Sequence, residues 1–314
     1  MRARLRIPAG PKPRTYPIFG PGHASQPVRR RFIRRPRPWV PRFILDHTGA
    51  GLDASLVAAG IKRRIGPHGI ATVRRRIAAL SVAHTFQGIA NEFNPCAAEP
   101  VRLLLSKARR VAVKAGWRPA KKKAATLDLL YPMLNTCRPD KLLDIRDQAL
   151  LFFAWASGGR RRSEVSEARA ENLTRVPDGF IYHLEHSKTD PEGRGLDVPL
   201  LGRAAETVSA WLSAAGIEAG PIFRPVGKGG RVCGEGIRPK TVARIVQRRA
   251  LLAGLDTSLF GGHSLRSGFV TEAGMQGKPL GDIMAMSGHK TVAVVNGYYQ
   301  AGNVLNSAAG KLAG

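Results

Sequence analysis

The sequence predicts a mainly helical protein with one small β-sheet, an α+β fold that is divided into two domains. A chain of 314 residues is long enough for about two domains. Apolar residues recur at helical spacing in most segments, whereas apolar and polar residues alternate near residues 179–186. A break that contains proline and a lysine triplet, residues 117–125, separates the two halves of this pattern.

The charge balance predicts a polyanionic partner. Fifty Lys and Arg against 22 Asp and Glu give a formal net charge of +28, which is typical of proteins that bind nucleic acid. No apolar run approaches the roughly 20 residues of a membrane-spanning helix, so we expect no membrane partner. The three cysteines, Cys96, Cys137 and Cys233, lack the spacing of a metal site and favour a reducing, cytoplasmic location.

Residues 1–45 are expected to form a basic arm. They contain twelve Lys and Arg, nine prolines and no acidic residue. The prolines oppose long helices and favour an extended chain. A disordered basic tail is the favoured interpretation, and an arm that contacts DNA is the alternative.

Residues 46–116 are expected to form a small helical domain that binds DNA. The stretch "TVRRRIAALSVAHTF" places Val73 and Ile77 on one apolar stripe, with Arg74 and Arg75 largely outside it. A second helix is expected over "EPVRLLLSKARRVAVKAG". The two arginines are therefore candidates for DNA contact, and an ordinary helical bundle with solvated arginines is the alternative.

After a linker at 117–125, residues 126–302 are expected to form the second domain. Apolar helical segments surround "LDLLYPML" and "IRDQALLFFAWAS". Phe180, Tyr182 and Leu184 alternate with Ile181, His183 and Glu185. Followed by a turn and "LDVPL", this pattern predicts a β-hairpin with "SKTD" near its bend. Residues 303–314 are left as a C-terminal tail.

Two basic segments in the last third are candidates for phosphate contact. In "GGHSLRSGFVTEAG", His263 and Arg266 lie one turn apart where a helix begins, and free backbone N–H groups there attract anions. In "RPKTVARIVQRRALLAG", apolar residues are expected to face inward, leaving Arg248 and Arg249 free to meet DNA. A His and an Arg at this spacing are common by chance, so the pair alone is weak evidence.

An ordered set of residues along the second domain is more specific. It resembles the signature of the tyrosine recombinase, or phage integrase, family, and the resemblance spans about residues 140 to 302. The matching positions are Gly159, Arg161, Ser163 and Glu164, then Lys188, then His263 with Arg266, then Gly288 with His289, and finally Tyr298.

The resemblance implies a fold and an activity. The fold would be a catalytic domain like that of DNA breaking-rejoining enzymes, preceded by a helical core-binding domain. The activity would be site-specific recombination of double-stranded DNA through a 3′-phosphotyrosyl intermediate, without metal, ATP or other cofactor, by a homotetramer on two sites. Tyr298 would be the nucleophile and Lys188 the acid for the leaving oxygen. The remaining catalytic residues would bind the phosphate, with Glu164 in support; these are Arg161, His263, Arg266 and His289.

The chain departs from the family pattern at three places. Arg160 stands where the family usually has an apolar residue, and Tyr299 directly follows Tyr298 as an alternative nucleophile. The family usually has about four amphipathic helices before the linker, and residues 1–45 are not expected to supply their share. The DNA-binding domain would then be abbreviated, or the chain a decayed copy. A type IB topoisomerase and a noncatalytic DNA-binding remnant or regulator are the rival functions.

Overall fold

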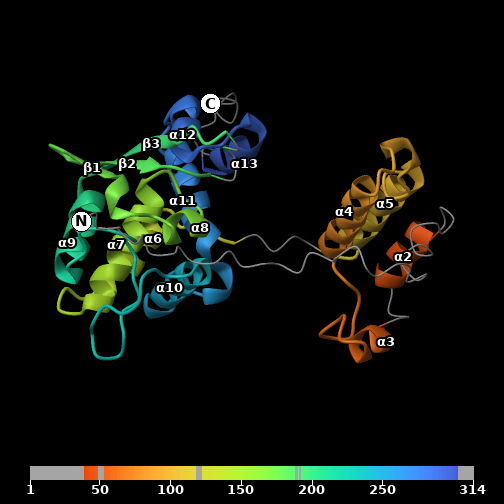
Figure 1. The fold of residues 1–314 in the computed structure, drawn as a ribbon, viewed down its shortest axis with the longest axis horizontal. Coiled ribbons are helices and arrows are strands. Elements are labelled where there is room, and N and C mark those ends of the chain that lie inside the picture. Colours follow the sequence, from red (N-terminus) through yellow and green to blue (C-terminus); the bar gives the residue numbers. More distant parts are fainter. Residues whose placement is uncertain (1–38, 49–52, 118–121, 188–189, 191, 303–314) are drawn as a thin grey trace, which may run out of the picture. The chain divides into compact units, whose positions relative to one another are not determined.

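The computed structural model describes most of two separate units. The chain divides into Met1–Pro119, the N-terminal unit, and Ala120–Gly314, the C-terminal unit (Figure 1). Within these described residues, no helix is both long and apolar enough to cross a membrane. The structure describes residues 39–48, 53–117, 122–187, 190 and 192–302, without the side chains of residues 294 and 299–302.

The described part of the N-terminal unit is a small helical bundle. Val40 and Ile44 lie four residues apart, as do Val73 and Ile77, so each pair faces one side of its helix. All four side chains are buried in one apolar cluster together with Val101. Burial of these stripes therefore holds the first, third and fourth helices together. The elements are α2 (Trp39–Thr48), α3 (Asp53–Ala58), α4 (Ile70–Phe86), η1 (Asn91–Phe93) and α5 (Glu99–Lys114).

Helix α2 corrects the expected extent of the basic arm. Residues 39–45, predicted to be extended, are helical, while residues 1–38 lie outside the described part of the chain. Pro41 is tolerated because it is the third residue of α2, where the backbone N–H has no partner within the helix. The local proline count was outweighed by burial of Val40 and Ile44. The described residues of this unit thus form four α-helices, the number that the resemblance implies.

Helix α7 lies at the centre of the C-terminal unit. Its residues Ala149, Leu150, Leu151 and Phe153 are completely buried, because other helices and the sheet cover it on several sides. The Phe153 ring packs edge-on against Tyr182, with 4.9 Å between ring centroids. Helix α7 is therefore anchored in the core. The helices of this unit are α6 (Leu127–Asn135), α7 (Leu142–Ala156), α8 (Arg162–Ser166), α9 (Arg203–Ala215), α10 (Pro239–Leu252), α11 (Gly262–Met275), α12 (Leu280–Ser287) and α13 (Val292–Gly302), with 3-10 turns η2 (Ala170–Asn172) and η3 (Thr257–Leu259).

A three-stranded antiparallel sheet accompanies these helices, in the order β1 (Leu173–Val176), β2 (Gly179–Leu184) and β3 (Leu196–Leu201). The predicted hairpin is confirmed: β2 pairs with β3, and the inward side chains Phe180 and Tyr182 are buried. Strand β1 was not predicted, because its four residues show no apolar alternation. The predicted fold class, mainly helical with a small sheet, is confirmed.

Residues 122–125, placed in the predicted linker, belong to the C-terminal unit and are hydrogen-bonded to its later residues. The Lys123 N–H donates to the carbonyl oxygen of Leu259 at 2.7 Å, and the Ala125 N–H donates to that of Ser264 at 2.8 Å. Gly268 permits this approach, since a Cβ there would lie 2.1 Å from the Ala125 oxygen. These contacts fix the segment that leads into α11.

Candidate active site

The predicted catalytic residues described by the structure come from four separate segments of the C-terminal unit. Arg161 directly precedes α8, and His263 and Arg266 lie in the first turns of α11. His289 follows α12, and Tyr298 lies on α13. These five residues form what we call the arginine–histidine pocket. Lys188 lies outside the described residues, as does the side chain of Tyr299.

Arg161 is held by a buried carboxylate. Its guanidinium donates to Glu164 Oε1 at 2.5 Å and to Ser187 Oγ at 2.8 Å, and its backbone N–H donates to Glu164 Oε2 at 2.9 Å. Burial favours the neutral form of Glu164, yet the hydrogen bonds from Arg161 outweigh burial and lower the pKa of this carboxyl group below its ordinary value. Glu164 therefore remains ionised and fixes Arg161. Ser187 directly precedes Lys188 in the sequence.

Arg266 lies at the base of the pocket and is only 3% exposed. Its guanidinium donates to the carbonyl oxygens of Gly159 and Ser287, both at 2.8 Å. Gly159 has a φ of +72°, and a Cβ there would lie 2.6 Å from the Arg266 Cα, so only glycine fits. Burial and then the positive charge of Arg161 lower the pKa of Arg266 to about 10. Arg266 stays charged at neutral pH.

His289 is neutral in this environment. Burial, and then the charges of Arg266 and Arg161, lower its pKa to about 4. Arg266 donates to His289 Nε2 at 3.1 Å. Because a guanidinium cannot accept a hydrogen bond, Nε2 carries no proton, and the ring proton lies on Nδ1. Nδ1 then donates to Ser287 Oγ at 2.6 Å, which fixes both the tautomer and the orientation of the ring.

The hydroxyl group of Tyr298 meets His263 in the same pocket. The phenolic oxygen lies 3.0 Å from His263 Nε2. The Tyr298 ring packs on an apolar cluster that includes Val270 and Val295, so packing limits its movement. Burial, followed by the charges of Arg266 and Arg161, lowers the pKa of His263. A neutral imidazole at this distance is able to accept the tyrosine proton.

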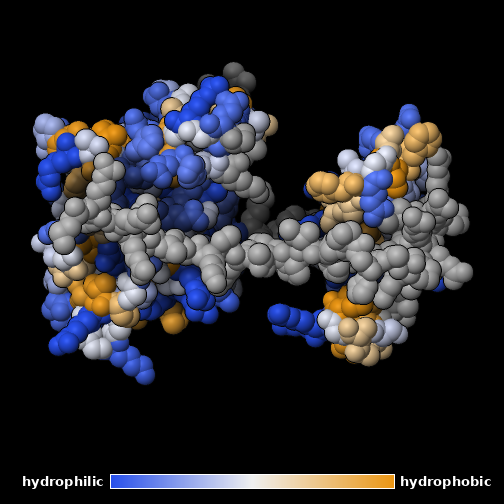
Figure 2. Space-filling view, viewed as in Figure 1, coloured by the Kyte–Doolittle hydropathy of each residue, from blue (hydrophilic) through white to orange (hydrophobic). Residues whose placement is uncertain are grey.

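A cavity of about 590 Å³ opens beside these residues. The cations Arg161 and Arg266 line it, and hydrophilic side chains gather over the part of the unit where Figure 1 draws α8 and α11 (Figure 2). One guanidinium group is able to donate two hydrogen bonds to two oxygens of the same phosphate, so the cavity suits a phosphodiester. Its lining also includes Lys122, Arg162, Gln247 and His263.

Comparison with known families agrees with this geometry. Residues 126–303, more than half of the chain, match the model of the phage integrase family. The chain belongs to the phage integrase family. This integrase is a site-specific tyrosine recombinase, an enzyme that cleaves and rejoins DNA. The resemblance inferred from the ordered motif is thereby confirmed.

Individual relatives of the integrase span most of its length. It is 35% identical over 239 residues to an integrase/recombinase XerD homolog of Selenomonas ruminantium, which covers 74% of this chain and 69% of the relative. Among solved structures it is similar to XerA recombinase, with 14% identity, 84% of each chain covered and a TM-score of 0.45. It is also similar to a lambda integrase dimer bound to a COC′ core site, with 19% identity, 85% of this chain and 95% of that one covered, and a TM-score of 0.44.

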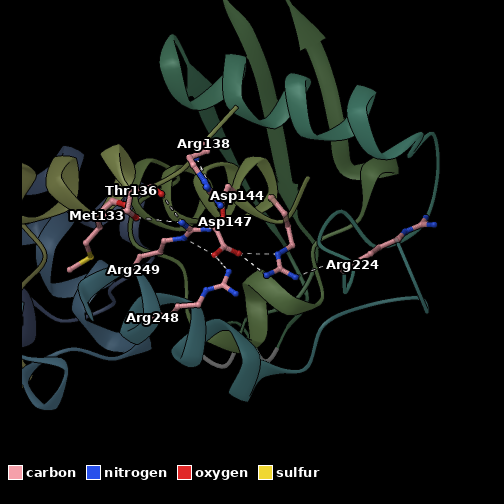
Figure 3. A network of polar contacts seen from close by, with 9 residues as sticks. Met133, Thr136, Arg138, Asp144, Asp147, Arg224, Arg248 and Arg249 are labelled. Carbon is pink, nitrogen blue, oxygen red and sulfur yellow. Dashed lines mark hydrogen bonds and ion pairs between the residues drawn. The ribbon is translucent and has the colours of Figure 1, made fainter. Parts of the chain in front are cut away.

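The expectation that Arg249 is free to meet DNA is wrong. Its side chain is 1% exposed and binds Asp144 and Asp147 of α7. Arg248 is partly exposed, but it also donates to Asp147, which accepts from Arg146 as well (Figure 3). We call these five residues the α7–α10 network. Arg249 follows Val242, Ile245 and Val246 at helical spacing, a signal in the sequence that places it on the buried stripe of α10.

Other residues of the site were not singled out by sequence. Ser187 and Ser287 each bind a catalytic candidate, Arg161 and His289 respectively. Only their positions beside Lys188 and Gly288 would have identified them. In the N-terminal unit, Arg74 and Arg75 are exposed on α4, so the structure leaves their side chains accessible.

Proposed function

We propose that the arginine–histidine pocket cleaves one DNA strand with Tyr298 as the nucleophile. The observation that carries this proposal is the Tyr298 hydroxyl, 3.0 Å from a histidine nitrogen in a pocket that also contains Arg161 and Arg266. A nucleophile within hydrogen-bonding distance of a base, beside donors for a phosphate, is the arrangement that phosphoryl transfer needs.

The chemical step balances within the protein and the DNA. The Tyr298 oxygen attacks the scissile phosphorus while His263 Nε2 accepts the phenolic proton. The bond between phosphorus and the 5′-oxygen breaks, leaving a 3′-phosphotyrosyl link and a 5′-hydroxyl. Lys188 is the proposed donor of the proton that the leaving oxygen takes. A 5′-hydroxyl from a second strand reverses the attack, so strand exchange conserves the phosphodiester bond energy without ATP.

The two pocket arginines stabilise the transition state electrostatically. Negative charge on the nonbridging oxygens grows during the attack, and fixed donors in a partly buried pocket act on it strongly. Arg266 is fixed by two carbonyl oxygens and Arg161 by Glu164, so neither has to be reorganised. His289 orients the guanidinium of Arg266 from the other side.

The assembly follows from the chemistry of exchange. Two duplexes present four strands to be cut, and each chain supplies one Tyr298. We therefore propose a homotetramer on two sites of double-stranded DNA, with residues 303–314 as a docking tail. The N-terminal unit, with Arg74 and Arg75 on α4, is proposed to grip the DNA backbone. The cytoplasm is the proposed compartment.

Covalent capture tests the proposal. Duplexes that carry a nick flanked by randomised sequence are incubated with the protein, and adducts that survive denaturant are isolated and sequenced. A selected nicked duplex then becomes the standard substrate. We expect Tyr298→Phe to abolish the adduct, and the matched control Tyr299→Phe to retain it.

Three outcomes would overturn parts of this proposal. An adduct that survives Tyr298→Phe and is lost in Tyr299→Phe would transfer the nucleophile to Tyr299. Relaxation of a supercoiled plasmid without exchange between two selected sites would indicate a topoisomerase. Tight binding with no adduct from the unmodified protein would indicate a DNA binder without catalysis.

A further inference from the structure

Arg160 is a buried arginine that the catalytic scheme above does not use. Its side chain is only 2% exposed, and its Nε has no hydrogen-bond partner in the described structure. A buried guanidinium is destabilising unless its environment compensates the charge.

The guanidinium of Arg160 binds the end of α12. It donates to the carbonyl oxygen of Met286, in the last turn of that helix. Carbonyl groups there have no partner within the helix and carry its negative end, so a cation is favourable. The next carbonyl, that of Ser287, accepts from Arg266. Two arginines therefore hold two successive carbonyl groups.

The end of α12 determines where His289 lies. Gly288, with a φ of +66°, turns the chain directly from α12 into His289. Ser287 binds the ring of that histidine through its Oγ. A shift of this last turn would move His289 away from Arg266, since only Gly288 separates the helix from the histidine.

The turn that carries Arg160 presses closely against α12. Gly158 has a φ of +90°, and a Cβ there would lie 2.1 Å from the Met286 oxygen and 2.8 Å from a terminal nitrogen of Arg160. Gly159 makes the corresponding approach to Arg266. The glycine pair thus brings one short turn against two catalytic segments, and Arg160 links that turn to α12.

We propose that Arg160 is a positioning residue, whose guanidinium fastens the end of α12 beneath the pocket and so keeps His289 against Arg266. This inference rests on the proposed function. Arg160 acts through His289 and Arg266, because its own side chain is buried and bound to the Met286 oxygen. The charge of Arg160 also adds to the effects that keep His289 neutral.

The test compares Arg160→Met with Arg160→Lys. Both replacements are unbranched, but only lysine donates a hydrogen bond to the Met286 oxygen. With the selected nicked duplex at saturation, we expect Arg160→Met to lower the rate constant of adduct formation roughly 10- to 100-fold, since small misplacements of catalytic groups have effects of that size. The final adduct yield and the Kd for DNA should stay within about twofold of the unmodified protein, and Arg160→Lys should recover part of the rate.

The thermal midpoint separates positioning from folding. Replacing a buried charge by an apolar side chain is often neutral or stabilising, so the Tm of Arg160→Met should be unchanged or higher. Arg146→Met is the matched control, because Arg146 is also buried but binds Asp147 in the α7–α10 network. It should lower the Tm and leave the rate constant unchanged.

Several results would overturn the proposal while leaving Tyr298 as the nucleophile. One is a rate constant of adduct formation in Arg160→Met that equals that of the unmodified protein. Another is an equal loss of rate in Arg160→Met and Arg160→Lys. Unfolding of both replacements, or a loss of yield with a lowered Tm and an unchanged rate constant, would show that Arg160 serves folding alone. An adduct that did not depend on Tyr298 would instead reject the proposed function.

Discussion

The C-terminal unit buries arginines in two places, and their partners differ. In the α7–α10 network each arginine donates to a carboxylate, and Asp147 accepts from three of them. In the arginine–histidine pocket, Arg266 donates instead to two carbonyl oxygens and a neutral histidine. The carboxylates of the network thus compensate much of the charge of its arginines. The partners of Arg266 are uncharged, so its charge remains available to a bound anion.

The pKa directions express the same difference. Burial lowers the pKa of Arg249, but Asp144 and Asp147 outweigh it and raise the pKa above its ordinary value. For Arg266, burial and the neighbouring arginines act together and lower the pKa to about 10. The charge of a buried cation matched by carboxylates is compensated within the fold, while a buried cation near other cations is suited to bind an anion. Within one unit, this contrast separates structural arginines from those proposed to be catalytic.

The largest effect should follow from breaking the network. Arg249→Met leaves the buried Oδ1 of Asp144 without its arginine and removes one of the three arginines that bind Asp147, so we expect the free energy of unfolding to fall by about 3–5 kcal/mol. Urea denaturation measures the loss. Arg248→Met is the control and should have a smaller effect, because this side chain is 37% exposed. A loss below about 1 kcal/mol in Arg249→Met would contradict a structural role for the network.

The next effect concerns the pocket. Arg266→Ala removes a fixed donor for the transition state, and we expect the rate of adduct formation to fall roughly 10²- to 10³-fold. Single-turnover cleavage of the selected nicked duplex measures it. Arg249→Met should leave the rate constant of its folded fraction unchanged. If Arg249→Met slows cleavage as much as Arg266→Ala does, the distinction between network arginines and pocket arginines is wrong.

A smaller effect should appear in the pH dependence of stability. The folded-state pKa of His289 is lowered to about 4, whereas the unfolded value is near 6.5. As the pH falls from 6.5 towards 4, the unfolded state therefore binds the proton first, and stability is lost. Above pH 6.5 the neutral form prevails in both states, so the stabilisation is fully present.

His289→Gln tests this direction. Urea denaturation across that pH window should show a weaker loss of stability in the variant than in the unmodified protein, because one titrating group has been removed. The remaining slope includes His263, whose pKa is also lowered. Identical slopes in the two proteins would contradict a neutral His289 in the folded state.

The smallest effect is expected outside both arginine clusters, on α4. Arg74→Ala and Arg75→Ala should each weaken DNA binding a few-fold and reduce the slope of log K against log salt by about 1 if the side chain meets a phosphate. Titration at several salt concentrations measures this. The rate constant at saturating DNA should not change. An unaltered slope in both variants would place the DNA contact elsewhere on the N-terminal unit.

Sequence could predict the parts of the fold that periodicity encodes. The α4 stripe with Val73 and Ile77 and the alternation of Phe180 and Tyr182 both formed as expected. Strand β1 could not be predicted, because its pairing with β2 is set by tertiary contact and not by its own four residues. Helix α2 was missed since the nearby prolines were weighed above the burial of Val40 and Ile44.

Motif spacing identified residues that the structure brings together, but it could not show how they are held. Arg161, His263, Arg266, His289 and Tyr298 meet in one pocket, although Arg161 and Tyr298 are far apart in sequence. The ion pairs of Arg249 with Asp144 and Asp147 depend on the packing of α10 against α7. The basic run "QRRALL" does not by itself indicate that packing. The bond of the buried Arg160 to the end of α12 likewise depends on a tertiary contact.

The most direct test of the account is to identify the amino acid that becomes joined to DNA. The adduct formed with the selected nicked duplex is digested with protease and nuclease, and the remaining nucleotide-bearing peptide is sequenced by mass spectrometry. We predict that the nucleotide is attached to Tyr298 through its 3′-phosphate. Attachment to Tyr299 or to any other residue would contradict the arrangement in which His263 and the two pocket arginines act on one phosphate.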